Sequence, residues 1–166
     1  MLSMVYYAKR SWGGEFIIRV TPYFVIKLLY LTEGNRGGLQ YHHFKDETGL
    51  LISGRLSILE GESLDSLRES TIIPGTIFSF KPGVIHREEA IEDSIILEIS
   101  TPHFNDRVRL DSDTKNDLQS TTPDQVVDLG KVESVPSTLR SIGFKQIPTS
   151  QLPEQILSNL SFAIFF

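Results

Sequence analysis

The stretch GGLQYHHFKDETGLLISG, residues 37–54, decides the fold. It places two histidines, His42 and His43, side by side in a chain that has only four. On a regular strand, residues two apart point to the same face and direct neighbours point to opposite faces. His42 therefore shares a face with Gln40, and His43 lies on the other face. The alternation predicts that the two histidines have different roles.

The same face gains further polar groups from the segments that follow. A tight turn at FKDE brings Glu47 to the start of the next strand, beside His42. His86 follows a Pro-Gly turn in KPGVIHRE, residues 81–88, and begins another strand. Inside a small barrel, inward side chains of neighbouring strands converge. We therefore expect Gln40, His42, Glu47 and His86 to bind one divalent metal ion. Imidazole, carboxylate and amide donors suit zinc, with iron, manganese or nickel as alternatives.

Turn signals and β-branched residues outside this stretch indicate more strands. Residues 15–32 predict two strands separated by Thr-Pro, and residues 39–43 predict a short one. Residues 48–61 predict a pair of strands around Gly54, where a turn or strand bend needs a residue without a side chain. Strong turn signals recur about every 8–12 residues from 13 to 102, which is typical of an all-β sandwich or barrel. Three further short strands are expected in STIIPG (70–75), TIFSFKPG (76–83) and DSIILEIST (93–101).

The C-terminal part has a different composition. Residues 111–125 are polar and charged, which predicts a linker or loop. Beyond it we expect one more strand at 126–132 and short helical pieces at 136–144 and 150–166. The apolar end SFAIFF predicts packing on the barrel or on a second subunit. The expected organisation is a barrel domain at 1–110, a linker at 111–125 and an extension at 126–166.

Composition excludes several classes of protein. The 166 residues are 40% hydrophobic, enough for one compact domain, and the absence of cysteine excludes disulfides and thiolate metal sites. The net charge of −5, without a basic stripe, argues against nucleic-acid binding. The N-terminus does not look like a signal peptide, and no apolar run reaches the roughly 20 residues that span a bilayer. We therefore expect a cytoplasmic protein that binds neither membranes nor nucleic acids.

The spacing of the candidate ligands resembles the two sequence motifs of the cupin superfamily. Gln40, His42, Glu47 and Gly54 match the first motif, and Pro82-Gly83 with His86 match the second. Cupins usually have histidine where this chain has Gln40. The motif with glutamine at this position resembles that of the cupin domain of type II mannose-6-phosphate isomerases. Further matches are K9-R10-S11-W12-G13, Lys27, the stretch 34–47 and H86-R87-E88, so the resemblance covers roughly residues 9–111. The chain departs from that pattern at Ser11, Gly38 and Thr48-Gly49.

This resemblance implies a double-stranded β-helix, or jelly-roll barrel, with a short, partly helical C-terminal extension. It also implies metal-dependent interconversion of an aldose phosphate and a ketose phosphate, and a homodimer. The residues themselves suggest a rim that binds the phosphate or carboxylate of the ligand, made of Lys27, Arg36, Lys45 and Arg87. The general base is not identified, although Glu88 or Glu89 could point inward. Two alternatives stay open: a non-catalytic module that binds metal and a small molecule, and an iron-dependent dioxygenase.

Overall fold

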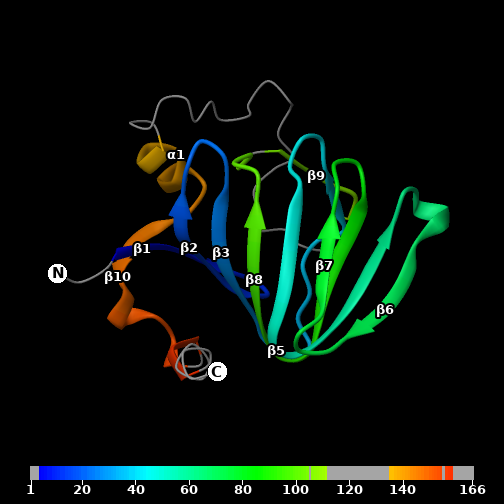
Figure 1. Cartoon of the computed structure of the whole chain (residues 1–166), viewed down its shortest axis with the longest axis horizontal. Helices are drawn as coiled ribbons and strands as arrows, with labels where there is room; N and C mark the ends of the chain where they lie inside the picture. The colour runs from blue at the N-terminus through cyan, green and yellow to red at the C-terminus, as the bar shows by residue number, and fades with distance from the viewer. Residues whose placement is uncertain (1–3, 105, 112–134, 155, 159–166) are drawn as a thin grey trace.

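The computed structural model describes residues 4–104, 106–111, 135–154 and 156–158 (Figure 1). These residues form an antiparallel β-structure with short helical segments. The helical segments are η1 (Leu64–Ser66), α1 (Val135–Ser141) and η4 (Thr149–Gln151). The strands are β1 (Met4–Arg10), β2 (Gly13–Val20), β3 (Val25–Leu31), β4 (Gln40–His42), β5 (Glu47–Gly61), β6 (Arg68–Ile72), β7 (Ile77–Phe80), β8 (Ile85–Ser100), β9 (Arg107–Arg109) and β10 (Lys145–Pro148).

Two long strands, β5 and β8, organise the barrel. They pair antiparallel along almost their whole length, from Glu47 opposite Ser100 to Gly61 opposite Ile85. Strands β6 and β7 pair with β5 on its other edge, while β3 and β4 pair with β8. Register shifts near the middle of β5 bend the pair, so that the sheet curls around an interior (Figure 1). The all-β fold class expected from the sequence is confirmed.

Gly54 explains why one strand stands where two were expected. Its φ is +89°, and a Cβ at this position would lie 2.3 Å from the backbone oxygen of Asp93 and 2.7 Å from the Cα of Ser94. The chain bends sharply here without leaving the ladder, because only glycine tolerates both the angle and the contact. The predicted pair of strands is therefore one continuous strand, β5, with a bend inside it.

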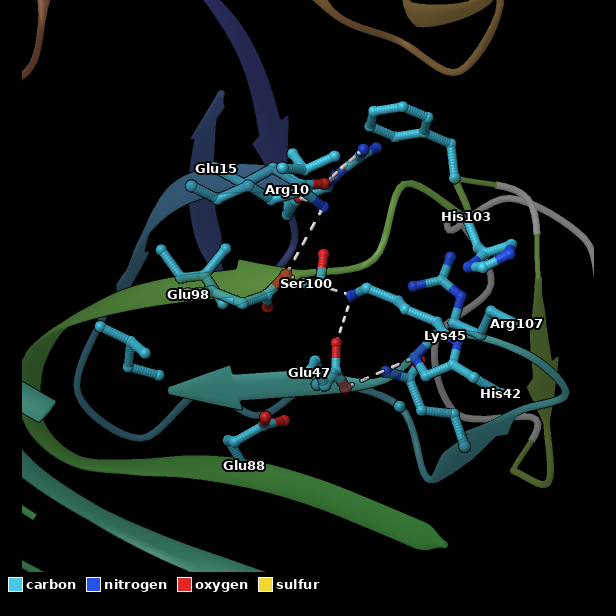
Figure 2. A pocket seen from close by; sticks show the side chains of 18 of the residues that line it. Arg10, Glu15, His42, Lys45, Glu47, Glu88, Glu98, Ser100, His103 and Arg107 are labelled. Carbon is cyan, nitrogen blue, oxygen red and sulfur yellow. Dashed lines mark hydrogen bonds and ion pairs between the residues drawn. The ribbon is translucent and has the colours of Figure 1, made fainter. Parts of the chain in front are cut away.

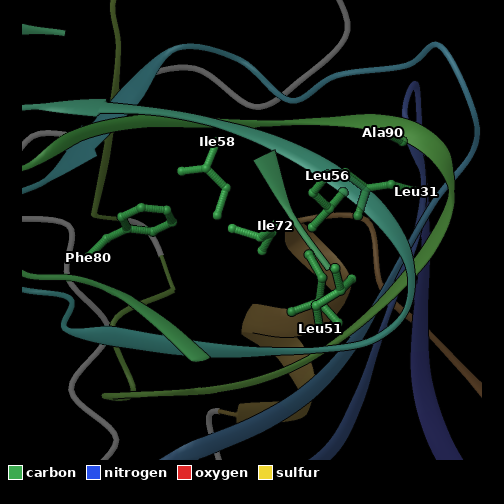
Figure 3. Close-up of a cluster of buried hydrophobic side chains, with 8 residues drawn as sticks. Leu31, Leu51, Leu56, Ile58, Ile72, Phe80 and Ala90 are labelled. Atoms are coloured by element: carbon green, nitrogen blue, oxygen red, sulfur yellow. The ribbon is translucent and has the colours of Figure 1, made fainter. Parts of the chain in front are cut away.

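The apolar core has an inner and an outer part. One inner cluster fills the end of the barrel between β5, β6, β7 and β8 (Figure 3). It contains the fully buried side chains of Leu51, Leu56 and Phe80. A second inner cluster joins β1, β2 and β3 to α1. A third cluster, the outer cluster, lies on the opposite face of β2 and β3. This division follows from the alternation of side chains along each strand.

The C-terminal extension holds the edge of the sheet from both faces. Strand β10 pairs with β1, from Met4 opposite Pro148 to Tyr7 opposite Lys145. Leu139 and Phe144 belong to the second inner cluster, on one face of the sheet. Leu152 and Ile156 pack in the outer cluster on the other face. The linker after residue 111, the strand expected at 126–132 and the apolar end at 161–166 lie outside the described residues.

The structure also differs from the sequence expectation at its ends. Strand β1 was not predicted, because its alternation is weak and its partner strand, β10, lies about 140 residues away along the chain. The helical piece predicted at 136–144 corresponds to α1, which ends at Ser141. Within the described ranges, none of the helices has the length and apolar character that a membrane crossing requires.

Candidate metal centre

Three of the candidate ligands meet inside the barrel. His42 ends β4, Glu47 begins β5 and His86 lies near the start of β8, so three strands supply one side chain each. The Oε1 atom of Glu47 lies 2.9 Å from Nε2 of His86 and 3.5 Å from Nε2 of His42. One nitrogen or oxygen from each of the three residues lies within 4.8 Å of the others. All three side chains are buried.

Gln40 joins these residues through the sheet ladder. It stands directly opposite His86 in the pairing of β4 with β8, so the two side chains share a face. Its Oε1 atom is buried and has no hydrogen-bond partner among the described residues. His43, by contrast, is exposed and packs edge-on against Tyr41, with ring centroids 5.3 Å apart. The two neighbouring histidines therefore point to opposite faces, as the alternation predicts.

The hydrogen bonding of His86 leaves one ring nitrogen for the centre. Its Nδ1 lies 3.0 Å from the backbone oxygen of Val84. A carbonyl oxygen can only accept, so Nδ1 carries a proton. In the metal-free protein Nε2 faces the carboxylate of Glu47, and with a metal ion bound the neutral ring would offer its Nε2 lone pair to the metal. An imidazole with one nitrogen bonded to a backbone carbonyl and the other turned toward the ligand cluster is typical of histidines that bind metals. The ring of Phe80 stacks on His86 at 4.0 Å and fixes its orientation.

The protonation of the centre depends on Glu47. Burial lowers the pKa of His42 below its ordinary value and outweighs the interaction with Glu47, which favours the neutral ligand form. Burial also lowers the pKa of His86, but Glu47, Glu88 and the Val84 carbonyl together outweigh it and raise the pKa. Burial raises the pKa of Glu47 itself, yet Lys45 and the two histidines together hold it well below 4.5. Without a metal ion, a proton on His86 neutralises part of this charge.

The donors fit a divalent metal ion. Two imidazole nitrogens, a carboxylate oxygen and an amide oxygen form a mixed set that suits zinc and the neighbouring transition metals. Ligands about 2.1 Å from a metal and 90–110° apart lie about 3.0–3.4 Å from each other. The observed 2.9 Å and 3.5 Å separations are close to these values. Buried polar atoms without partners are rare in proteins, so unpaired atoms on Gln40, His42 and His86 indicate a group that binds between them.

A chain of alternating charges leads away from the centre across the pocket (Figure 2). Lys45 contacts the second oxygen of Glu47 and lies 3.1 Å from Glu98. Lys27 lies 4.0 Å from Glu98 and 3.1 Å from Glu15, which is also bound by Arg10 at 2.6 Å. We call these six residues the charge chain: Arg10, Glu15, Lys27, Glu98, Lys45 and Glu47.

Opposite charges shift the pKa values of Glu15 and Lys45 strongly. Burial raises the pKa of Glu15, but Lys27 and Arg10 outweigh it and lower the value to about 2. Burial lowers the pKa of Lys45, but Glu47 and Glu98 raise it far above its ordinary value. These groups therefore stay ionised across the physiological range.

The rim residues expected from the sequence are distributed differently. Lys27 and Lys45 line the pocket, but both are bound to carboxylates of the charge chain. Arg36 is exposed and forms a β-bridge with Glu89, outside the pocket lining. Arg87 lies 3.7 Å from Asp111 and does not line the pocket. The role of these four residues in substrate binding stays a prediction.

Sequence reasoning missed other groups that face the same cavity. Arg10 and Arg107 line the pocket, together with Trp12 from the β1–β2 connection and Phe144 from the extension. Arg107 stands opposite His42 in the pairing of β4 with β9. No local signal announces that pairing, because the two strands are far apart in the sequence. The match at K9-R10-S11-W12-G13 was the available signal for Arg10 and Trp12.

Glu88 is the carboxylate that the charge chain does not include. It lies two residues after His86, on the same face of β8, and lines the pocket (Figure 2). Burial raises the pKa of Glu88 to about 7. The positive charge of His86 opposes this shift, whereas the negative charges of Glu47 and Glu98 add to it. A carboxyl group with such a value can both take up and release a proton near neutral pH.

The pocket around these residues is small. Its cavity measures about 130 Å³. Sites for drug-sized ligands usually measure about 300–1,000 Å³. Trp12, Leu31 and Ile96 close the end that faces the inner core, while His103 and Arg107 lie toward β9. The space suits a small molecule.

Comparison with solved structures identifies the fold. The capsular polysaccharide assembling protein CapF from Staphylococcus aureus is 18% identical, with a TM-score of 0.55 over 67% of this chain and 32% of CapF. Oxalate decarboxylase OxdC from Bacillus subtilis is 20% identical, with a TM-score of 0.54 over 61% of this chain and 29% of its own. A Klebsiella pneumoniae protein with a double-stranded β-helix domain is 17% identical, with a TM-score of 0.51 over 63% of this chain and 86% of its own.

These likenesses concern the fold alone, because every identity is low. The chain spans only about a third of CapF and of oxalate decarboxylase. No protein-family model matches the sequence, and no curated protein matches it. The strand pairing and the structural neighbours agree, and the protein has the all-β, double-stranded β-helix fold of the cupin type.

Proposed function

We propose that the protein binds one divalent metal ion through Gln40, His42, Glu47 and His86 and uses it to act on a small anionic carbohydrate. The observation that carries the metal site is the meeting of the buried side chains of His42, Glu47 and His86, in which the Nε2 atoms of both histidines have no hydrogen-bond partner among the described residues. Oxalate decarboxylase, a structural neighbour, is described with Mn(II) centres. Zinc is our first choice, with iron, manganese and nickel as alternatives.

The charges around the pocket favour an anionic ligand. Four basic and four acidic side chains line it, so their charges balance when Glu88 is ionised and the histidines are neutral. A bound divalent cation leaves the site with an excess of about two positive charges, which attracts an anion. The eight side chains are those of Arg10, Lys27, Lys45, Arg107, Glu15, Glu47, Glu88 and Glu98.

The reaction we propose is the interconversion of an aldose phosphate and a ketose phosphate, similar to that of mannose-6-phosphate isomerases. A metal ion at this site acts as a Lewis acid toward the sugar oxygens. Glu88 takes the proton from C2 and returns it to C1, while the hydroxyl proton moves from O2 to O1, so no atom is gained or lost. Glu88 lines the pocket beside the candidate ligands, and its pKa of about 7 in the metal-free protein lies near the range in which a carboxyl group can accept and donate a proton.

A second candidate reaction follows from the identity of the ligands. His42, His86 and Glu47 form a set of two histidines and one carboxylate, which is the donor set of many non-heme iron oxygenases. An iron-dependent dioxygenase is therefore the alternative enzyme. A module that binds a metal and a small molecule without turnover is the third possibility.

Metal content and turnover test these proposals together. Elemental analysis of the purified protein should show about one equivalent of zinc, and His42→Ala should lose it. The metal-loaded protein should convert mannose 6-phosphate to fructose 6-phosphate, and Gln40→Ala and His42→Ala should reduce the rate at least 100-fold. Wild-type turnover no faster than in these two variants at saturating metal would rule out the isomerase. Oxygen consumption by the iron-loaded protein would favour the dioxygenase, and ligand binding without turnover would favour the module.

Glu88→Gln separates the base from the metal site. We expect this variant to bind zinc as wild type does, because Glu88 is not a ligand, and to lose most of its turnover. Glu89→Gln, the matched change at the neighbouring residue outside the pocket, should keep full activity. Equal rates in the two variants would remove Glu88 from the mechanism.

A further inference from the structure

A buried carboxylate behind the metal centre holds the loop that connects two of the candidate ligands. Asp106 precedes β9 and is 1% exposed. Its oxygens accept hydrogen bonds from three successive backbone N–H groups, those of His43 at 3.1 Å, Phe44 at 2.6 Å and Lys45 at 2.6 Å. Asp106 itself does not line the pocket, and its side-chain hydrogen bonds are those to this loop.

The loop is short and is bounded by metal-ligand candidates at both ends. Four residues, 43–46, separate His42 from Glu47. Three consecutive N–H groups that point at one carboxylate form a concave anion-binding arrangement and fix the backbone angles of the loop. A second anchor lies at Asp46, whose backbone exchanges hydrogen bonds with Thr101 at 3.1 Å and 3.0 Å.

The geometry of the loop controls the geometry of the centre. It sets how far Oε1 of Glu47 lies from Nε2 of His42, now 3.5 Å, and it points Lys45 toward Glu47. If the N–H groups lost their acceptor, they would turn toward water or another partner, because unpaired buried donors are costly. The metal ligands would then no longer be held at the separation that a metal requires.

We propose that Asp106 is a positioning residue that sets the metal affinity of the centre by fixing the loop between β4 and β5. This inference rests on the proposed metal-binding function. Groups that support metal ligands from outside the coordination sphere typically change the affinity about 10–100-fold when they are removed.

Two asparagine variants in the same region test the role of Asp106. Asp106→Asn and Asp46→Asn each remove one negative charge. Only the first replaces an acceptor oxygen of the loop with an NH2 group, because the Asp46 side chain is exposed and its backbone contacts remain. Zinc affinity is measured by competition with a chelating dye, at a temperature where circular dichroism shows both variants folded. We expect a Kd about 10-fold weaker for Asp106→Asn and less than 2-fold weaker for Asp46→Asn. Equal values would overturn the inference.

Amide exchange provides a second readout that needs no metal. In the metal-free wild type, the N–H groups of Phe44 and Lys45 should exchange slowly although Phe44 is exposed. Asp106→Asn should speed their exchange and leave the Leu51 N–H, which donates to Thr76, unchanged. If the variant does not fold, loop-like exchange of these two amides in the wild type would still overturn the inference. A wild type that binds no zinc contradicts the proposed function, whereas equal affinities contradict only the role of Asp106.

Discussion

Lys45 is the residue through which the candidate metal centre connects to the rest of the pocket. Its ammonium group lies between the carboxylates of Glu47 and Glu98, and all three side chains are buried. Lys45 and Glu47 share a face because they lie two residues apart as the chain enters β5. The lysine binds Oε2 of Glu47 and leaves Oε1 to the histidines, so it orients this carboxylate for a metal ion.

Replacing Lys45 by methionine should destabilise the metal-free protein. The change leaves Glu47 and Glu98 buried without their cation, and breaking a buried pair in this way costs about 3–5 kcal/mol. Zinc should recover part of this loss, because the metal supplies positive charge beside Glu47. Urea unfolding with and without zinc measures both effects. Lys81→Met removes an exposed lysine and should change stability by less than about 0.5 kcal/mol. Equal stabilities of the two variants would contradict the role of Lys45.

Glu15 should make stability depend on acid pH. Its folded-state pKa of about 2 lies below the ordinary 4.5, so its contribution is complete above pH 4.5 and is lost as the pH falls toward 2. At about 1.4 kcal/mol per pKa unit, this contribution is about 3 kcal/mol. Between pH 4.5 and 2, wild type should therefore lose about 3 kcal/mol more stability than Glu15→Gln. Urea unfolding across this range measures the difference, and parallel curves for the two proteins would refute the assignment.

At the scale of the element, the long strand β5 carries both the metal centre and the bend that closes the barrel. Glu47 begins the strand, and the register shifts near Gly54 turn its second half toward β6. The bend cannot move along the strand, because the backbone of Asp93 and Ser94 approaches Gly54 too closely for any side chain. The position of this glycine therefore sets where the barrel curves.

Gly54→Ala should be more destabilising than the same change at Gly75. The two glycines have almost the same φ, +89° and +90°, so both variants have the cost of a positive φ, about 1–2 kcal/mol. Only at Gly54 does the added Cβ meet backbone atoms, since nothing lies within 4 Å of it at Gly75. We expect a difference of about 2 kcal/mol or more between the variants by chemical denaturation, because overpacking costs roughly this much. A difference near zero would show that the strand relaxes around the methyl group.

At the scale of the whole molecule, local patterns predicted more than long-range pairing did. The β-branched runs and Pro-Gly turns indicated the strands of the barrel, and strand alternation was enough to separate His42 from His43. The spacing of Gln40, Glu47 and His86, with its resemblance to the two cupin motifs, predicted that these residues meet, and each of them lies near the start of a strand. These features depend on a few neighbouring residues, which a sequence displays directly.

Other features depend on which distant segments meet. The burial of Lys45 between two glutamates requires Glu98, which lies 53 residues away. Arg107 faces the pocket only because β9 pairs with β4, and Phe144 does so because the extension returns to β1. A single sequence carries no local sign of these pairings, so the charge chain and the role of Asp106 emerged only in three dimensions.

The homodimer expected from the resemblance stays a prediction. Ile77 and Ile99 are exposed on the outer face of the barrel, at 69% and 48%. Light scattering after gel filtration should give twice the chain mass of 18.7 kDa. A mass of one chain at micromolar concentration would contradict it.

Trp12 gives the pocket an intrinsic optical signal. It is the only tryptophan of the chain, it lines the pocket and its backbone oxygen is bound by Thr32. Light at the long-wavelength edge of protein absorption therefore excites one indole, which lines the pocket. Emission wavelength and quenching by acrylamide would report occupancy directly, so fluorescence can screen candidate molecules without an assay for turnover.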